Sequence, residues 1–149
     1  MTDTNNGAPS LAAAAHFIEA ILVDDKGYTS PRELVLLRLA ASRAGNSAVR
    51  ENKLRQAAAF ADSFTTGSWR DALRSRFELA EFCLANGKYA DAAVELNLVL
   101  VTIKRYFSPG NHAMAQMHRV RAFCLRECGC HLGSAREEQL AASMERGGR

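Results

Sequence analysis

The sequence predicts an all-α protein of about seven helices that pack as antiparallel hairpins in a short α-solenoid. Hydrophobic residues recur at spacings of three and four in seven stretches, which is the period of an amphipathic helix. Ala, Leu, Arg and Glu, which all favour helices, dominate the composition. The turns between the stretches are short, so successive helices must run antiparallel. The 149 residues, of which 48% are hydrophobic and 23% charged, suit one compact domain.

The first two helices are expected to begin at serine caps. One helix is expected over residues 10–24, from Ser10 to a polar turn at residues 25–27. The next should begin at Ser30 and Pro31, with Glu33 completing a capping box. Gly45 is expected to end it in a left-handed conformation.

The remaining helices follow from turn residues and from the apolar period. They are expected over residues 48–64, from Ser68 to 86 with Asp71 in the first turn, over 89–107, over 111–128, and from Ser134 to 145. The segment 108–110 should break the chain between two of them. A single domain is therefore expected over residues 10–145, with a disordered tail at 1–9 and a frayed tail at 146–149.

An internal repeat accompanies this pattern. Gly45, Gly87 and Gly129 follow one another at intervals of 42 residues. At the same interval several pairs agree in kind, namely Leu37 with Leu79, Ala80 with Ala122, Leu54 with Leu96, and Phe64 with Tyr106. A lone hairpin cannot cover its own apolar face, so equivalent hairpins must stack. The first helix should seal the N-terminal end of this stack by packing an apolar stripe on the next hairpin; the stripe comprises Leu11, Phe17, Ile21 and Leu22.

The middle unit carries a recognisable motif. Leu79-Ala80 is followed by the run Asn86-Gly87-Lys88-Tyr89-Ala90-Asp91-Ala92-Ala93, and then by Leu96 and Val99. This motif resembles the tetratricopeptide repeat (TPR), and the interval of 42 is similar to the longer variety typified by kinesin light chain. The resemblance covers roughly residues 31–144, although Ser47 and His131 replace the turn aromatic in the flanking units. A HEAT- or armadillo-like stack is the alternative, since its period is comparable.

The resemblance implies that the first helix of each hairpin lines a concave groove that holds a partner's peptide or helix. The groove residues would be Arg32, Val35, Leu39 and Ser42, then Arg74, Phe77, Glu81 and Leu84, and then Gln116, Arg119, Phe123 and Arg126. Arginines would pair with carboxylates and the apolar residues would act as anchors, so an acidic, partly hydrophobic segment is the expected partner. The alternatives are that these arginines form an ordinary solvated face, or that the groove mediates self-association.

The sequence does not favour catalysis. His16, His112 and His118 have no neighbours in sequence that suggest a catalytic arrangement, and phosphate-binding glycine motifs are absent. Cys124, Cys128, Cys130 and His131 allow an alternative function as a thiol- or zinc-dependent sensor. Structural zinc more often uses two separated cysteine pairs, and cysteine is a common small core residue. We therefore assign no catalytic residue, metal ligand or cofactor, and expect a protein-binding adaptor, co-chaperone or regulator.

Charge and hydropathy bound the partners and the compartment. The net charge is only +3, and no Lys/Arg cluster is interleaved with aromatic residues, which argues against nucleic acid as a partner. The apolar stretch at residues 11–23 is too short to span a bilayer and contains His16 and Glu19. It also lacks the flanks of a signal peptide. The expected location is the cytoplasm, where the four cysteines would stay reduced.

Overall fold

The structure is a computed structural model that describes residues 9–23, 29–62, 69–106 and 112–147. Within these ranges the chain forms seven α-helices and no strand, which confirms the predicted fold class. The helices are α1 (Ala12–Val23), α2 (Arg32–Arg43), α3 (Ser47–Asp62), α4 (Trp69–Ala85), α5 (Tyr89–Tyr106), α6 (His112–Glu127) and α7 (His131–Gly147). None of these described helices combines the length and the hydropathy needed to cross a lipid bilayer.

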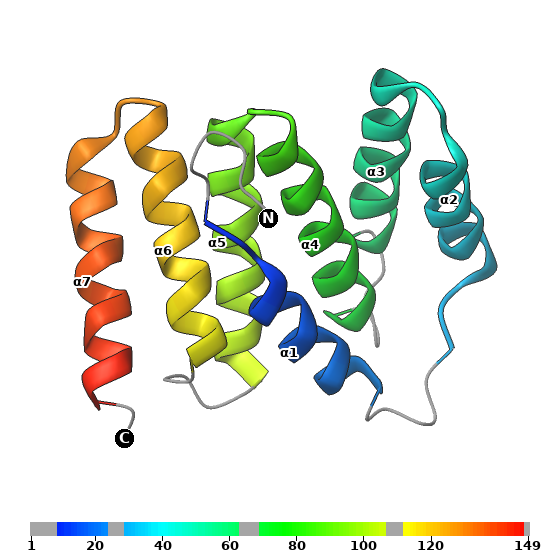
Figure 1. The fold of residues 1–149 in the computed structure, drawn as a ribbon. Coiled ribbons are helices and arrows are strands. Elements are labelled where there is room, and N and C mark those ends of the chain that lie inside the picture. Colours follow the sequence, from blue (N-terminus) through cyan, green and yellow to red (C-terminus); the bar gives the residue numbers. More distant parts are fainter. Residues whose placement is uncertain (1–8, 24–28, 63–68, 107–111, 148–149) are drawn as a thin grey trace.

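Helices α2 to α7 form a row in which each helix packs against the next, as in a solenoid (Figure 1). The hairpins are α2–α3, α4–α5 and α6–α7, joined through the α3–α4 and α5–α6 interfaces. The main core lies in the middle of the row, where Leu79, Leu96, Ile103, Met114 and Met117 are fully buried. The α2–α3 hairpin has a smaller core of its own, made of Leu34, Ala57 and Ala61.

The position of α1 differs from the expectation that it seals the end of the stack. It lies across the row and packs on α6 and α4 (Figure 1). The eight residues 24–31 that separate α1 from α2 can span up to about 27 Å when extended, so α1 is free to pass the first hairpin. The apolar stripe of α1 predicted that the helix is buried on one side, but it did not specify the surface that buries it.

Two of the three repeating glycines have the predicted backbone conformation. Gly87 has φ 72° and Gly129 has φ 92°, and both end a helix. After each glycine the next N–H donates to a carbonyl five residues earlier, Lys88 to Cys83 at 2.8 Å and Cys130 to Leu125 at 2.7 Å. This bond is characteristic of the Schellman ending of a helix. The α4–α5 and α6–α7 turns therefore repeat the same local geometry 42 residues apart.

The α2–α3 hairpin uses different ends, and here two predictions are wrong. Gly45 is not left-handed, because α2 already ends at Ala44 in an extended conformation with φ −68° and ψ 127°. The capping box at Ser30 does not form either, since the Ser30 hydroxyl donates to the carboxylate of the buried Asp71 on α4 at 2.6 Å. The cap at the start of α3 is Asn46, whose Oδ1 accepts from the Ala48 and Val49 amides.

The C-terminal helix also differs from its predicted bounds. It begins at His131, one turn before Ser134. Ser134 does not cap the helix, since its hydroxyl is buried against α6 and donates to the Ala122 carbonyl at 2.8 Å. Helix α7 continues through Arg146 and Gly147, so the helix extends into the segment expected to be a frayed tail. The predicted cap at Ser68, the break at 108–110 and most of the tail at 1–9 lie outside the described residues.

The glycine conformations lead to a stability prediction. We expect Gly87→Ala to lower the free energy of unfolding by about 1 kcal/mol, because alanine is strained at positive φ. Gly45→Ala is the matched control, since Gly45 lies in a hairpin turn without positive φ and an added Cβ there would meet open space. It should change the free energy by about 0.5 kcal/mol or less. Urea unfolding of both variants measures the difference, and equal losses would contradict this explanation of the turns.

Candidate partner-binding groove

The face of the row that carries α1 is the candidate groove. Helix α1 and the residue before it bury an apolar stripe there, with Leu11 6%, Ala14 0% and Ile18 3% exposed. The spacing of these residues, three and then four, places them on one side of the helix. On the opposite side His16, Glu19 and Ala20 remain exposed.

Two polar contacts orient α1 on this face. The Ala14 amide, in the first turn of α1, donates to Oε1 of Gln116 on α6 at 3.2 Å. First-turn amides lack an acceptor inside the helix, so Gln116 satisfies a group that would otherwise need water. At the other end Nη1 of Arg74 on α4 lies 2.8 Å from Oε2 of Glu19. The pKa of Glu19 is lowered from its ordinary value, chiefly by this hydrogen bond.

The α4 residues predicted for the groove lie beside α1. Arg74, Phe77 and Glu81 line a cavity of about 90 Å³ beneath α1, together with Ala15, Ile18, Glu19 and Glu78. Phe77 is buried and Leu84 is half-buried, so both contribute to the core as well as to the groove. Arg74, Phe77 and Glu81 thus lie on the side of α4 that faces α1.

The α6 residues predicted for the groove separate into different environments. Gln116 contacts α1, whereas Arg119 pairs with Glu138 and Glu145 on α7. Phe123 is buried against Tyr89, with the two rings edge to face and their centroids 5.4 Å apart. Arg126 is exposed, and its guanidinium carbon lies 5.7 Å from the centre of the Phe123 ring.

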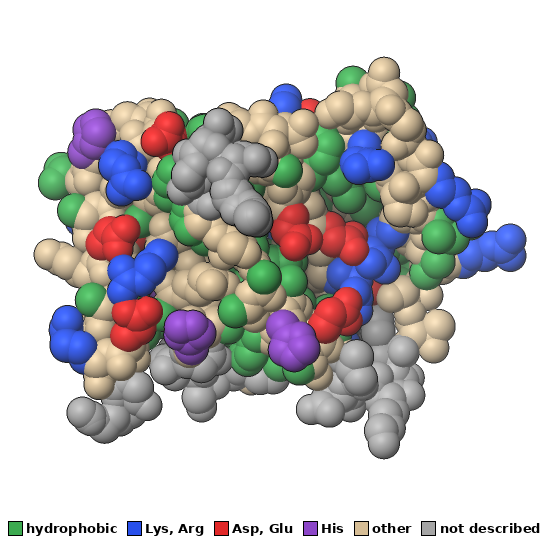
Figure 2. Space-filling view, viewed as in Figure 1, with side chains coloured by type: hydrophobic (Ala, Val, Ile, Leu, Met, Phe, Trp, Pro, Cys, Tyr) green, Lys and Arg blue, Asp and Glu red, His purple; other side chains and the backbone are tan. Residues whose placement is uncertain are grey.

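The α2 residues predicted for the groove are all exposed: Arg32, Val35, Leu39 and Ser42. Val35 is 39% and Leu39 42% exposed, so these two remain available as apolar contacts. Figure 2 shows acidic and basic side chains beside one another on the face that carries α1, with hydrophobic side chains between them. The pairs of Arg74 and Arg119 mean that two of the predicted partner-binding arginines already have carboxylates from this chain.

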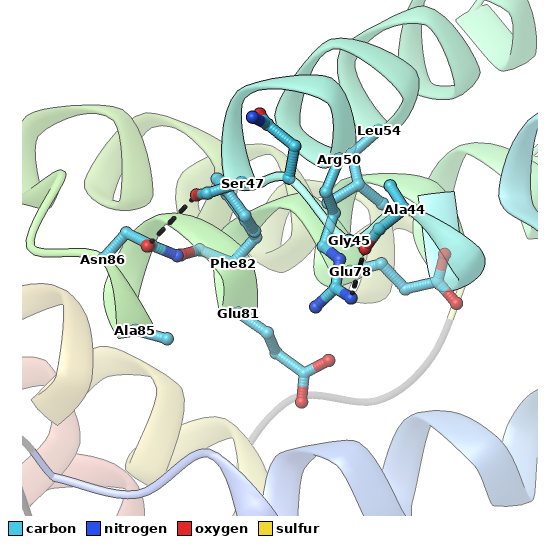
Figure 3. Close-up of a pocket in the computed structure, with 11 residues that line it drawn as sticks. Ala44, Gly45, Ser47, Arg50, Leu54, Glu78, Glu81, Phe82, Ala85 and Asn86 are labelled. Carbon is cyan, nitrogen blue, oxygen red and sulfur yellow. Dashed lines mark hydrogen bonds between the residues drawn. The ribbon is translucent and has the colours of Figure 1, made fainter. Parts of the chain in front are cut away.

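A second hollow adjoins the α1 seat, between the α2–α3 turn and the C-terminal half of α4 (Figure 3). Its volume is about 510 Å³, and its walls include Asn46, Leu54, Phe82 and Asn86. Arg50 closes one side by donating to the carbonyls of Ala41 and Ala44 at 3.2 and 3.0 Å. Glu78 and Glu81 line both this hollow and the cavity beneath α1, so the two spaces share one acidic wall.

The two carboxylates of this wall differ in their partners. Glu78 forms a two-point ion pair with Arg38 of α2, in which Arg38 Nε lies 3.0 Å from Oε1. Glu81 extends from α4 toward α1 (Figure 3), and no ion pair to it occurs among the described residues. Glu81 is exposed as a whole residue, but partial desolvation of its carboxyl group, with a smaller contribution from the neighbouring Glu78 carboxylate, raises the pKa of Glu81 to about 7. The groove therefore contains one acid that titrates near neutral pH.

A buried polar network at the α6–α7 interface was missed by the sequence reasoning. His118 was expected to lack an acidic partner, but its Nδ1 hydrogen-bonds to Glu137 of α7. Burial alone would raise the pKa of Glu137, but His118 and Arg121 together lower it. Arg121 contacts Glu137 at 2.8 Å and also donates to the Ala93 carbonyl at 2.9 Å. The network joins α5, α6 and α7 and has a structural role.

The cysteine cluster of the alternative sensor function does not converge. Cys124 is fully buried, whereas Cys128 and Cys130 are exposed on the α6–α7 turn. Burial raises the pKa of Cys124 to about 12 and that of Cys83 to about 11, so both remain thiols. In the part of the chain that the structure describes, no three His, Cys, Asp or Glu side chains lie where they could share a metal ion.

No match was found among protein-family models, curated proteins or solved structures. The resemblance to TPR proteins therefore rests on the residues and turns of this chain alone. What the groove can bind follows from its own geometry.

The titration of Glu81 should appear in thermal stability. A raised pKa means that ionisation of Glu81 disfavours the folded state, and this cost is present above about pH 7 and absent below pH 4.5. We expect Glu81→Gln to stabilise the protein at pH 8 by about 1 kcal/mol, allowing for solvent screening of this partly exposed side chain. At pH 4 the variant and the wild type should melt alike. Melting curves at both pH values are the measurement, and a gain that is independent of pH would contradict the assignment.

The buried network yields the opposite pH dependence. We expect Glu137→Gln to lower the free energy of unfolding by about 2 kcal/mol at pH 7, because it weakens bonds to His118 and Arg121. The pKa of Glu137 is lowered, so the wild-type advantage should fade as the pH falls below 4.5. The neighbouring Glu138→Gln, which affects only a half-exposed pair with Arg119, should cost about 0.5 kcal/mol or less. Similar losses in the two variants, by urea unfolding, would refute the structural role.

Proposed function

We propose that this chain is a non-catalytic, TPR-like protein-interaction module, acting in the cytoplasm as an adaptor, co-chaperone or regulator. Its α2, α4 and α6 face would hold an acidic, partly hydrophobic helix of a partner protein. The observation that carries the proposal is that this face already holds a helix, α1, on α4 and α6. A surface that binds one amphipathic helix through side-chain contacts is a suitable surface for another.

The chemistry of α1 supports the expected type of partner. Residues 12–23 contain the acidic Glu19 and no Lys or Arg, and the helix buries aliphatic and alanine side chains. Arg74 supplies the complementary charge at 2.8 Å. An acidic, partly hydrophobic helix is therefore the class of ligand that this groove accommodates within its own chain.

The open parts of the face give a partner room for further contacts. Val35 and Leu39 are exposed on α2, and Arg126 is exposed near the end of α6. The sensor alternative has weaker support, because the thiol of Cys124 is buried whereas those of Cys128 and Cys130 are exposed. Zinc analysis of the purified protein, with and without Cys128→Ser, distinguishes that alternative.

The proposal is tested by affinity capture with the purified full-length protein. We compare the wild type with Val35→Glu/Leu39→Glu in the groove and with Val94→Glu/Leu98→Glu on α5 as the matched control. All four parent residues are exposed, at 37–56%, so neither pair should disturb the core. A groove partner should be retained at least about 10-fold less by the α2 variant, since apolar anchors dominate most interfaces. Its retention by the α5 variant should be unchanged.

The opposite result would refute the groove. If the partner is lost with the α5 variant and kept with the α2 variant, the binding surface lies on the other side of the row. Thermal melting of both variants checks that the comparison concerns folded protein.

A further inference from the structure

We propose that α1 closes the groove of the free protein and that a partner helix with the same pattern displaces it. The partner would carry aliphatic or alanine side chains at the positions of Leu11, Ala14 and Ile18, and a carboxylate at the position of Glu19. This inference rests on the proposed function and deepens it, because it specifies the sequence pattern of the partner and a regulatory role for α1.

Helix α1 and the residue before it join the main core through Leu11, Ala14 and Ile18, but they do so by contacts with helices that are remote in sequence. Helix α1 packs on α6 and α4, which are remote in sequence, and the bond from Ala14 to Gln116 joins residues 102 positions apart. Its polar side is open to solvent, whereas α4, α5 and α6 are buried on several sides by one another. The interfaces between consecutive helices of the row are formed without residues of α1.

The stability of α1 depends on this seat. A helix of 12 residues is marginal in water on its own, so α1 remains helical chiefly because the groove buries one side of it. That side has three buried side chains, one of them an alanine, and four more that are only partly buried against the core: Ala15, Phe17, Ile21 and Leu22. A partner helix that buries equal or greater apolar area can therefore compete for the same surface.

Two polar side chains of the groove become available for a partner when α1 leaves. Gln116 would again present an amide oxygen to a first-turn N–H, and Arg74 would again present its guanidinium to a carboxylate at the position of Glu19. These two groups fix both the direction and the register of a helix between them. The partner should therefore bind in the orientation of α1.

The tether makes α1 an effective competitor. A segment joined to its site by a short connection has an effective concentration in the millimolar range. A partner can bind only those molecules in which α1 has left the groove, so its apparent dissociation constant rises as that fraction falls. Weakening α1 should therefore increase partner binding, whereas weakening the groove should decrease it.

The test uses a fluorescent peptide of residues 9–23 and full-length protein, with anisotropy as the readout. Ile18→Glu in the protein removes a buried anchor of α1, and Ala20→Glu is the matched control on the exposed side. We expect Ile18→Glu to bind the peptide at least about 10-fold more tightly than the wild type, because the competing segment is weakened. Ala20→Glu should bind like the wild type.

A second variant guards against misfolding of Ile18→Glu. Glu19→Arg alters only an exposed ion pair, since the Glu19 side chain is 57% exposed, and should raise peptide affinity by about 3-fold. Adding Arg74→Glu to Glu19→Arg restores the pair in reversed order and should return α1 to its seat. A peptide carrying Ile18→Glu should fail to bind any of these proteins.

Three outcomes would overturn the inference. Equal peptide affinity for the wild type, Ile18→Glu and Glu19→Arg would show that α1 does not compete, while leaving a groove that binds helices. Absence of peptide binding in every variant would reject the α1 pattern, and the capture experiment would then decide the proposed function separately. Wild-type dimers that the peptide dissociates would mean that a second copy of this chain is the occupant.

Discussion

Close packing of small residues between α4, α5 and α6 is the constraint on which the rest of the structure depends. Ala80 and Ala92 are fully buried in the main core, and Ala122 is fully buried on α6, where its carbonyl accepts from Ser134 of α7. A larger side chain at any of the three would force neighbouring helices apart. The left-handed endings at Gly87 and Gly129 return the chain with the same local geometry each time. Together they set α4 and α6 at the separation that α1 bridges, so the groove follows from the core.

The sequence was sufficient for the repeating part of this arrangement. The helix number and the 42-residue interval could be predicted because periodicity and turn glycines are local signals. The seat of α1 could not be predicted, since an apolar stripe does not specify the surface that buries it. The pairs of Arg119 with Glu138 and Glu145, and of His118 with Glu137, depend on how α6 and α7 are rotated against one another. The spacing of residues along the sequence does not specify how two packed helices are rotated about their axes.

The electrostatics of the groove follow from which charges find partners inside the chain. Arg38 neutralises Glu78, and Arg74 neutralises Glu19, so these four charges hold helices together. Glu81 lies between the two pairs and shares a wall with both. Its position makes the groove sensitive to any cation or proton that a partner brings. Sequence position alone suggested a row of partner-binding arginines, whereas in the folded chain Arg74 and Arg119 are paired with carboxylates and Glu81 has no ion pair among the described residues.

Polar contacts attach the first hairpin to α4 at one edge of the candidate groove. Ser30, just before α2, hydrogen-bonds to Asp71 of α4, and Arg38 of α2 forms an ion pair with Glu78. The apolar side of α2 buries Leu34 in the small core with α3 and Ala41 in the main core. Polar contacts exchange with water at little net cost, unlike the interlocked alanines farther along the row. The first hairpin is therefore held to α4 by two kinds of contact, the polar pairs of Ser30 and Arg38 and the burial of Ala41, Leu54 and Ala58 in the main core, so a substitution at either pair would weaken only part of this attachment.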